Sequence, residues 1–365
     1  MSSDRADPLA LPDLASRALR GSVIAASDEF FAEKENLISP GTPTFTAHTF
    51  GHKGQVYDGW ETRRRRGHSA DGGLLPGADE HDWAIVRLGA PGVVHAVVVD
   101  TAHFTGNYPQ ACSVEACWAD GYPDLAALES ARWVELVPRS PLTGDAAHPL
   151  EIPAAARRRY SHVRLRIFPD GGVARLRVHG VVVPDPALLD GLTFDLAALE
   201  NGGDVAACSD RFYSAPRNAI SPGLSRVMGE GWETRRRRAA GNEWLAVRLA
   251  GQAVVSLVEV DTSGYIGNSP GMAEVRGYAG RRSAGASAAG DDVAWDDPSS
   301  WAPLLTRTRL LPDTPHRFRV AAGGAHSLVR LDVLPDGGVA RLRLYGSLTS
   351  EGLARVRERW AQTAL

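Results

Sequence analysis

Cysteine and long apolar runs are scarce in this sequence. The cysteines, Cys112, Cys117 and Cys208, form an odd count without a C-x-x-C spacing, which favours buried free thiols over a disulfide framework or a zinc site. No apolar stretch is long enough to span a membrane, and residues 1–21 interleave charged residues with short apolar ones instead of forming a signal sequence. We therefore expect a cytoplasmic protein that is neither secreted nor inserted into a membrane.

An excess of charge of either sign is lacking as well. The chain has 40 Lys+Arg and 43 Asp+Glu, a formal net charge of −3, so no overall basic field attracts nucleic acid or an anionic membrane. Lys34 and Lys53 are the only lysines, and arginine supplies the remaining positive charge. Guanidinium groups recognise planar carboxylates better than ammonium groups do, although a codon bias of the genome explains the same composition.

The sequence does contain an internal duplication. Residues 59–66, Gly-Trp-Glu-Thr-Arg-Arg-Arg-Arg, recur without change at 231–238, and residues 169–177, which begin with Pro-Asp-Gly-Gly, return at 335–343. An identity of eight residues that includes tryptophan does not arise by chance. Because 365 residues exceed the usual size of one compact domain, the duplication predicts two domains.

The order of these landmarks predicts the domain boundaries. We place repeat one at about 22–182, a linker at 183–203, repeat two at 204–348 and a C-terminal helix at 349–365. The spacing between corresponding landmarks changes where loops differ in length. A longer loop is therefore expected at 67–82 in repeat one, and an exposed, mobile stretch at about 280–300 in repeat two.

The periodicity of the hydrophobic residues predicts an all-β fold. Residues 163–167 and 173–178 alternate apolar and polar side chains around a turn-like Pro-Asp-Gly-Gly segment, so we expect these strands to form a hairpin. Residues 93–99 are nearly all apolar, as in a strand inside a sandwich, and helical patterns are confined to the start, 124–132 and 351–362. The pattern predicts two tandem jelly-roll β-sandwich repeats of the galactose-binding-like kind, with short peripheral helices.

The motifs, taken in order, resemble those of the allantoicase family. The resemblance rests on Phe30 with Asn-Leu-Ile at 36–38, Asp-Gly-Trp-Glu-Thr-Arg-Arg at 58–64, Asp-Trp at 82–83, Asp-Thr-Ala-His-Phe-Thr-Gly-Asn at 100–107 and Pro-Asp-Gly-Gly at 169–172. Partners of these motifs in the second half extend the resemblance to nearly the whole chain. It implies tandem jelly-roll repeats, hydrolysis of allantoate to ureidoglycolate and urea in allantoin and purine degradation, and assembly into a homo-oligomer.

The chemistry of that substrate indicates which residue types would bind it. Allantoate carries a carboxylate and two ureido groups, so an arginine fork suits the carboxylate, and Asn, Asp or Glu suit the ureido N–H and C=O groups. The motifs supply these types, and we expect the substrate to contact Trp60, Arg63, Asp100 and Asn107 in repeat one and Glu233, Arg235 and Asn268 in repeat two.

Two residues are candidate catalytic groups, Glu61 and His103. Release of urea needs a proton delivered to the departing nitrogen and a water molecule activated or admitted at the central carbon, which suits a carboxylate or an imidazole. Whether water displaces urea directly or adds to an imine formed by elimination is open. The second half has Gly264 and Ser269 where the first has His103 and Tyr108, which favours the first repeat if catalysis is confined to one.

A structural role explains the Trp-Glu-Thr-Arg motif as well as a catalytic role does. Tryptophan in a β-sandwich usually belongs to the core, and Glu61 and Arg63, at i and i+2 on one face of a strand, are placed for an ion pair. Both repeats hold the motif. A shared folding requirement, a shared site and two equivalent sites per chain therefore all fit.

No cofactor is predicted, and a divalent metal ion stays an open alternative. His48 and His52 share a face at i and i+4, and Asp-Glu-His-Asp at 79–82 offers oxygen ligands, but neither spacing is specific for a metal. The arginine runs at 63–66 and 235–238 are short, which favours a solvated face with ion pairs over nucleic-acid binding. Two other functions compete: a β-sandwich module that binds a ligand without catalysis, and a hydrolase of a related ureide such as ureidoglycolate.

Overall fold

The computed structural model describes residues 7–66, 75–278, 293, 295, 297–321 and 323–365. Two compact units divide the chain. The first unit ends at Val183 and also includes the last residues of the chain, Thr363–Leu365. The second unit comprises Pro184–Gln362. The loops predicted at 67–82 and 280–300 lie in part outside the described residues.

Each unit includes residues that precede its predicted repeat. Leu14, before the predicted start of repeat one, and Leu196, inside the predicted linker, are both fully buried. The preceding residues, Asp13 and Asp195, each accept a backbone hydrogen bond of 2.9 Å from the last long strand of their unit. Residues 184–203 thus pack as part of the second unit, because a buried leucine and a half-buried carboxylate attach them to it.

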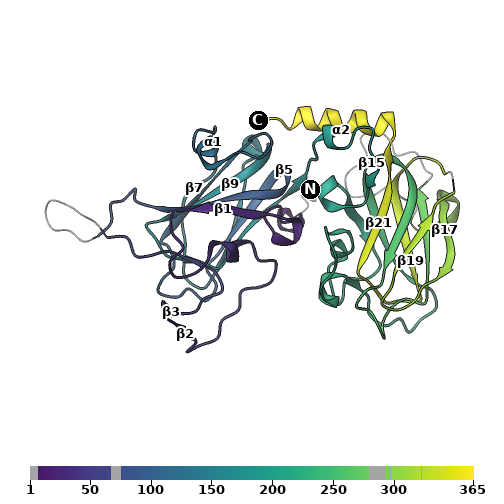
Figure 1. Ribbon diagram of the computed structural model, residues 1–365, viewed down its shortest axis with the longest axis horizontal. Helices are drawn as coiled ribbons and strands as arrows, with labels where there is room; N and C mark the ends of the chain where they lie inside the picture. Colours follow the sequence, from purple (N-terminus) through teal and green to yellow (C-terminus); the bar gives the residue numbers. More distant parts are fainter. Residues whose placement is uncertain (1–6, 67–74, 279–292, 294, 296, 322) are drawn as a thin grey trace, which may run out of the picture. The chain divides into compact units, whose positions relative to one another are not determined.

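The first unit is an antiparallel β-sandwich (Figure 1). Its main strands are β1 (Ser22–Ala26), β5 (Asp82–Asp100), β6 (Ala111–Cys117), β7 (Val134–Pro141), β8 (Ala147–Glu151), β9 (Arg159–Phe168) and β11 (Arg175–Val182). They pair in the order β1-β5-β9-β6-β7, and β8 and β11 also pair with β5. Two short pairs complete the unit: β2 (Phe50–Gly51) with β3 (Gly54–Gln55), and β4 (Trp60–Glu61) with β10 (Gly172–Val173).

Strand β5 is long enough to serve both layers of the sandwich. Its first half pairs with β1 and β9, and its last half pairs with β8 and β11. The pairing register with β9 shifts between Arg87 and Gly92. Gly89 lies in this interval, where a Cβ atom would be 1.9 Å from the carbonyl O of Leu19, so only glycine allows the two segments to approach.

The predicted hairpin between residues 163–167 and 173–178 is wrong. The strands that contain these residues, β9 and β11, each pair with β5 and not with each other. Between them, β10 pairs with β4. A two-residue hydrophobic period identifies a half-buried strand but not its partner, and here the Pro-Asp-Gly-Gly segment connects strands of different layers.

The second unit repeats this plan (Figure 1). Its strands are β12 (Phe194–Asp195), β13 (Asp204–Cys208), β14 (Trp232–Glu233), β15 (Glu243–Asp261), β16 (Met272–Tyr278), β17 (Trp301–Arg309), β18 (Pro315–Arg319), β19 (His326–Leu334), β20 (Gly338–Val339) and β21 (Arg341–Leu348). The order is β12-β21-β15-β19-β16-β17, with β13 and β18 also on β15 and β14 paired with β20. The prediction of an all-β protein built from two tandem repeats is confirmed.

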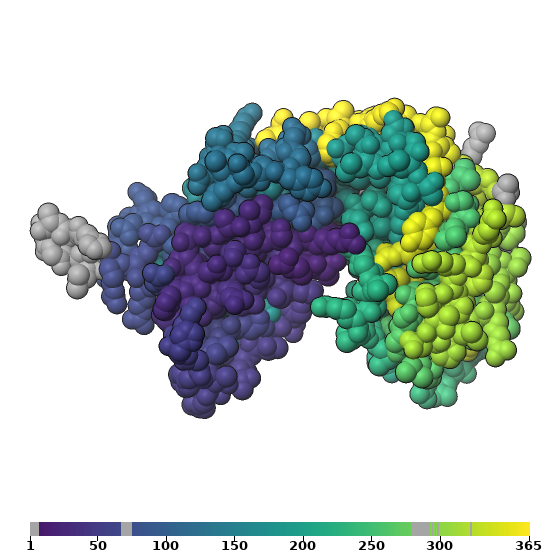
Figure 2. Space-filling model, viewed as in Figure 1, coloured from purple at the N-terminus to yellow at the C-terminus, as the bar shows by residue number. Residues whose placement is uncertain are grey.

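Helices are short and peripheral. The α-helices are α1 (Leu125–Glu129) and α2 (Ser350–Gln362). Short 3-10 turns are η1 (Pro8–Ala10), η2 (Arg17–Leu19), η3 (Lys34–Ile38), η4 (Ala154–Ala156), η5 (Pro186–Leu188), η6 (Leu199–Asn201), η7 (Pro216–Ile220), η8 (Met228–Glu230) and η9 (Pro298–Ser300). Helix α2, yellow in Figure 2, covers part of the second unit and buries Val356 against it. Within the described residues, no helix is long and apolar enough to cross a membrane.

His162 on β9 is a buried histidine whose protonation the fold opposes. It is 1% exposed, its Nδ1 lies 2.9 Å from Oγ of Ser161, and its Nε2 has no hydrogen-bond partner among the described residues. Burial, helped by the charge of Arg87, lowers the pKa of His162 from 6.5 to about 4. The folded protein therefore favours the neutral form of His162.

We expect the free energy of unfolding to fall as the pH drops from 6.5 towards 4, since the unfolded chain then binds a proton that His162 in the fold rejects. The pKa difference corresponds to about 3 kcal/mol. Urea unfolding curves at about pH 7 and pH 4.5 measure the loss. His162→Gln stays neutral and should show a smaller loss than His52→Gln, a control at an exposed position. Equal losses in the two variants would contradict this prediction.

Candidate active site

The two signature segments of the first repeat lie against each other. The backbone N of Thr62 donates to the carbonyl O of Gly171 at 3.1 Å, and the backbone N of Gly171 donates to the Thr62 hydroxyl at 3.2 Å. The backbone N of Arg65 donates to Oδ2 of Asp170 at 2.6 Å. The next glycine, Gly172, packs so closely that a Cβ atom would lie 2.0 Å from the ring of Phe104. These contacts fix the path of the chain where it leaves β4.

Glu61, at the end of β4, faces a polar cleft. Its Oε1 accepts a hydrogen bond of 2.8 Å from Nδ2 of Asn107, so the structure brings together two residues that the sequence predicted as site residues. Burial raises the pKa of Glu61 above its ordinary value of 4.5, while the Asn107 hydrogen bond and the charge of Arg64 act in the opposite direction. A carboxyl group in such surroundings is suited to proton transfer.

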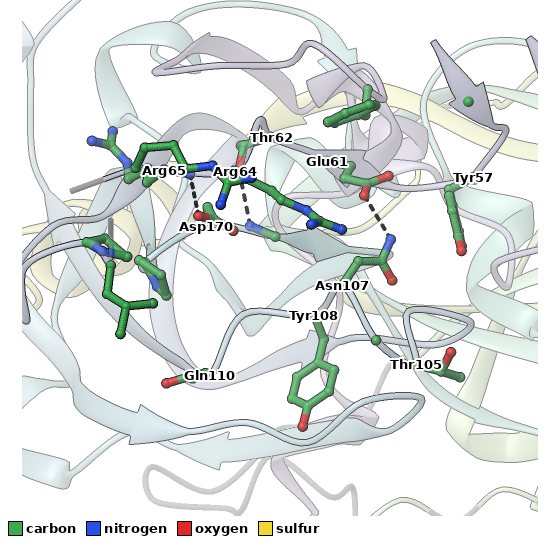
Figure 3. A pocket seen from close by; sticks show the side chains of 18 of the residues that line it. Tyr57, Glu61, Thr62, Arg64, Arg65, Thr105, Asn107, Tyr108, Gln110 and Asp170 are labelled. Atoms are coloured by element: carbon green, nitrogen blue, oxygen red, sulfur yellow. Dashed lines mark hydrogen bonds between the residues drawn. The ribbon is translucent and has the colours of Figure 1, made fainter. Parts of the chain in front are cut away.

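The cleft around Glu61 has a volume of about 970 Å³ (Figure 3). Charged and hydrogen-bonding side chains supply most of its lining, among them Lys53, Gln55, Tyr57, Glu61, Arg64, Asn107, Tyr108, Gln110 and Asp170. The Arg64 side chain extends from near Asp170 towards Glu61 and Asn107 (Figure 3). It forms no ion pair or hydrogen bond with any described residue. The guanidinium is therefore available to an anionic ligand.

Trp60 does not contact the cleft, which corrects its prediction as a substrate-binding residue. It is fully buried, and its Nε1 donates to the carbonyl O of Asp28 at 2.7 Å. Trp232 has the same role in the second repeat, where its Nε1 donates to the carbonyl O of Asp210 at 3.0 Å. Tryptophan in this motif is a core residue because its indole needs one internal acceptor and apolar surroundings.

Arg63 also points away from the cleft. Its Nε lies 3.1 Å from Oδ2 of Asp28, and its guanidinium lies over the ring of Phe30, 4.8 Å from the centroid. The predicted pairing of Arg63 with Glu61 is wrong, because β4 ends at Glu61 and the next residues do not continue the strand. Arg64, which the sequence analysis did not single out, occupies the cleft in its place.

Asp100 and His103 shape a turn beside the site and do not line the cleft. Oδ1 of Asp100 accepts the backbone N of Ala102 at 2.8 Å. His103 adopts a left-handed backbone conformation with φ of 69°, and its backbone N donates to Oδ1 of Asp145 at 2.7 Å. The matching residue, Gly264, has φ of 82°. Both repeats therefore form a left-handed turn at this position, which glycine adopts without strain. The catalytic role predicted for His103 stays a prediction, since His103 does not line the cleft around Glu61.

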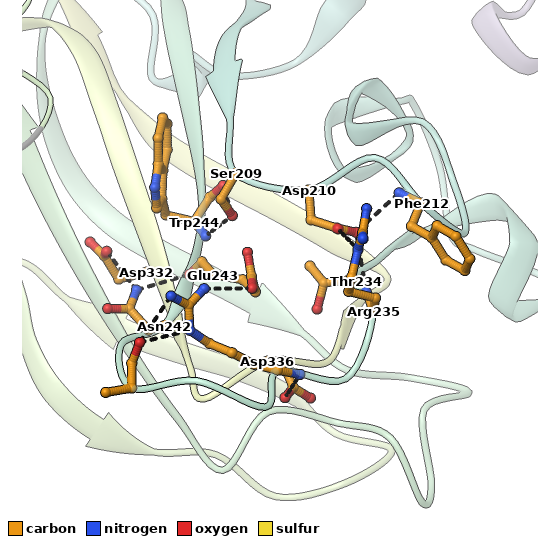
Figure 4. A network of polar contacts seen from close by, with 12 residues as sticks. Ser209, Asp210, Phe212, Thr234, Arg235, Asn242, Glu243, Trp244, Asp332 and Asp336 are labelled. Atoms are coloured by element: carbon orange, nitrogen blue, oxygen red, sulfur yellow. Dashed lines mark hydrogen bonds and ion pairs between the residues drawn. The ribbon is translucent and has the colours of Figure 1, made fainter.

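The second repeat has equivalent contacts, and Figure 4 shows one of them, between Arg235 and Asp210. Oε1 of Glu233 accepts a hydrogen bond of 2.7 Å from Nδ2 of Asn268, and Nε of Arg235 lies 2.6 Å from Oδ2 of Asp210. Arg235, like Arg63, is thus bound to an aspartate. Sδ of Met228 lies 3.6 Å from Nδ2 of Asn268, which gives the second Glu–Asn pair an apolar neighbour.

Within the described residues, no three His, Cys, Asp or Glu side chains gather as a group that could hold a metal ion. His48, His52 and the acidic residues at 79–82 therefore form no such cluster. The suggestion of a divalent ion gains no support from the described side chains.

Several cleft residues were missed by sequence reasoning. Tyr57 and Gln110 lie in segments without a motif, and Arg64 lies in an arginine run that was interpreted as a solvated face with ion pairs. Asp170 was assigned only to a turn. Tyr108 did carry a usable signal, because the second repeat has serine at the matching position.

The fold and the cleft define a class of protein: a tandem β-sandwich whose first repeat presents a half-buried carboxyl group beside an available guanidinium. A family model described as the allantoicase repeat matches residues 12–183 and 194–349. The chain therefore belongs to the allantoicase family.

Named relatives support this assignment over more than nine-tenths of the chain. A probable allantoicase from Nocardia farcinica is 54% identical over 340 residues, which cover 93% of this chain and 94% of the relative. An allantoicase from Dictyostelium discoideum is 40% identical, with 92% and 87% covered. The crystal structure of allantoicase from Saccharomyces cerevisiae matches with a TM-score of 0.73 at 30% identity, covering 92% of each chain.

Asn107→Ala is expected to raise the pKa of Glu61 further, since the variant lacks the N–H group that favours the ionised carboxylate. A carbon-13 NMR titration of the Glu61 carboxyl group measures the change. Asn268→Ala is the matched control, because it removes the same hydrogen bond in the second repeat and should leave the titration of Glu61 unaltered. Identical Glu61 titrations in the wild type and Asn107→Ala would count against the prediction.

Proposed function

We propose that the protein is an allantoicase, which hydrolyses allantoate to ureidoglycolate and urea in the cleft of the first repeat. One observation carries the proposal: in a chain of this family, Glu61 is held by Asn107 at 2.8 Å and faces the same cleft as the available guanidinium of Arg64. The arrangement offers a proton-transfer group beside an anion-binding group, which is what a substrate with a carboxylate next to the reacting carbon requires.

Arg64 binds the carboxylate of allantoate. A guanidinium accepts a carboxylate through two parallel N–H···O bonds, which fixes both the position and the orientation of the substrate. Arg63 and Arg65 are less suited to this role, because they are bound to Asp28 at 3.1 Å and Asp82 at 2.7 Å. Tyr57, Tyr108 and Gln110 also line the cleft, and their hydroxyl and amide groups suit the ureido N–H and C=O groups.

Glu61 delivers the proton to the departing nitrogen. Urea leaves readily only when its nitrogen gains a proton as the C–N bond breaks. Burial raises the pKa of Glu61, which increases the fraction of the acid form at a given pH. Asn107 keeps the carboxyl group oriented through its hydrogen bond to Oε1.

Urea release from allantoate by the purified protein tests the function. We expect urea and ureidoglycolate in equal amounts, and a comparison before and after chelation reveals any need for a divalent ion. Glu61→Gln should lower kcat by about 100-fold or more, while Glu233→Gln, the matched change in the second repeat, should stay near the wild-type value. A folded protein that releases no urea from allantoate or ureidoglycolate, with or without divalent metal, would overturn the proposal in favour of a ligand-binding module.

Arg64→Ala is expected to raise KM for allantoate about 10- to 100-fold, because a charge-assisted carboxylate contact is lost. Arg63→Ala is the control, since Arg63 is exposed and bound to Asp28 outside the cleft, and its KM should stay near the wild-type value. Steady-state kinetics of urea release measure both. A larger rise in KM for Arg63→Ala than for Arg64→Ala would refute the assignment of the carboxylate site.

We also infer a cytoplasmic location and a homo-oligomeric state. Cys112, Cys117 and Cys208 are all free, and burial raises the pKa of the Cys112 and Cys117 thiols to about 12, so these two stay protonated and unreactive. Free thiols fit a reducing compartment. The homo-oligomer rests on the resemblance to the family.

A further inference from the structure

Asp170 is a second carboxyl group in the cleft, besides Glu61, and has no role in the steps described above. It lies between β9 and β10 and lines the cleft with Glu61. Its Oδ2 accepts the backbone N of Arg65 at 2.6 Å, whereas its Oδ1 accepts no hydrogen bond from the described residues. The Arg65 guanidinium is bound to Asp82 at 2.7 Å. One oxygen of Asp170 is therefore held in place, and the other is available to a molecule in the cleft.

The Arg64 side chain lies between the two carboxyl groups and runs from near Asp170 towards Glu61 (Figure 3). Burial raises the pKa of both Glu61 and Asp170, and the positive charge of Arg64 acts in the opposite direction on each. Figure 3 shows Asp170 and Glu61 on different sides of the Arg64 side chain. If Arg64 binds the carboxylate of allantoate, the central carbon of the substrate lies in a site that has Glu61 towards one end and Asp170 towards the other.

We propose that Asp170 is the general base that takes the proton from the attacking water, opposite Glu61 as the general acid. This assignment rests on the proposed hydrolysis of allantoate. The C–N bond of the central carbon breaks, its electron pair goes to the urea nitrogen, and that nitrogen takes the proton of Glu61. Water supplies the new C–O bond, and its proton goes to Oδ1 of Asp170. Proton exchange with solvent then restores both groups.

The surroundings of Asp170 suit a base. Burial, together with the nearby charge of Asp82, raises the pKa of Asp170 above its ordinary value of 3.8, against the backbone hydrogen bond from Arg65. A higher pKa makes the carboxylate a better proton acceptor while leaving it ionised above that pKa. Loss of the carboxylate should therefore remove the acidic limb of the pH profile of kcat, since that limb reports protonation of the base.

The second repeat supplies a control for a purely structural role. Oδ2 of Asp336 accepts the backbone N of Arg237 at 2.7 Å, the counterpart of the bond between Asp170 and Arg65. Asparagine keeps a side-chain oxygen that accepts this bond but cannot act as a base. Asp170→Asn and Asp336→Asn thus make the same structural change, and only the first alters the cleft.

The experiment compares urea release from allantoate by the full-length wild type, Asp170→Asn and Asp336→Asn. We expect kcat of Asp170→Asn to fall about 100-fold or more with KM changed by less than about threefold, and the acidic limb of its kcat profile to disappear. Asp336→Asn should keep kcat and its pH profile. Equal losses in both variants, or a retained acidic limb in Asp170→Asn, would overturn the assignment.

A second variant covers the case in which Asp170→Asn fails to fold. Asp170→Ser leaves room for formate, which should raise its kcat about tenfold or more by replacing the missing carboxylate, without effect on the wild type. No increase with formate in a folded Asp170→Ser would contradict the role of Asp170. If the wild type hydrolyses allantoate and the Asp170 variants keep full activity, only the role of Asp170 is overturned. If the wild type releases no urea, the proposed function is overturned as well.

Discussion

The hydrogen bonds between the Trp-Glu-Thr-Arg and Pro-Asp-Gly-Gly segments determine how the cleft is built. The Thr62 hydroxyl and backbone bind Gly171, and Asp170 binds the backbone of Arg65. Because these bonds fix the chain just after β4, three consecutive arginines point in three directions. Arg63 turns to an aspartate outside the cleft, Arg64 enters the cleft, and Arg65 reaches a buried aspartate.

The same bonds explain why the motif is present twice. Thr234 and Gly337 exchange the equivalent contacts in the second repeat, and Trp232 is as fully buried as Trp60. The repeats differ outside the motif. Residues 41–59 of the first repeat are replaced by the shorter segment 223–231 in the second, so β2 and β3, which bring Lys53 and Gln55 to the cleft, have no counterpart of the same length. The hydrogen bonds of the motif are therefore common to both repeats, and the loops around the motif differ between them.

The sequence predicted the duplication and the all-β class, because these depend on local patterns and on motifs that recur in order. It named Glu61 and Asn107 as site residues but did not predict the hydrogen bond between them. It did not predict which strands pair, since a two-residue period is the same whatever the partner. Nor did it predict the direction of each arginine, which depends on where β4 ends. The left-handed backbone conformation of His103, which explains why glycine stands at the matching position, is likewise not visible in residue types.

The shared scaffold also bears on how such chains diverge. A copy of this repeat that lost its catalytic ability through changes in its loops would still gain from the hydrogen bonds of its signature, which recur in both repeats. The second repeat already has the same Glu–Asn pair with Met228 beside it. A pseudoenzyme within this family would therefore be recognised from the residues that surround the motif, and the motif itself would be a marker of a folded sandwich.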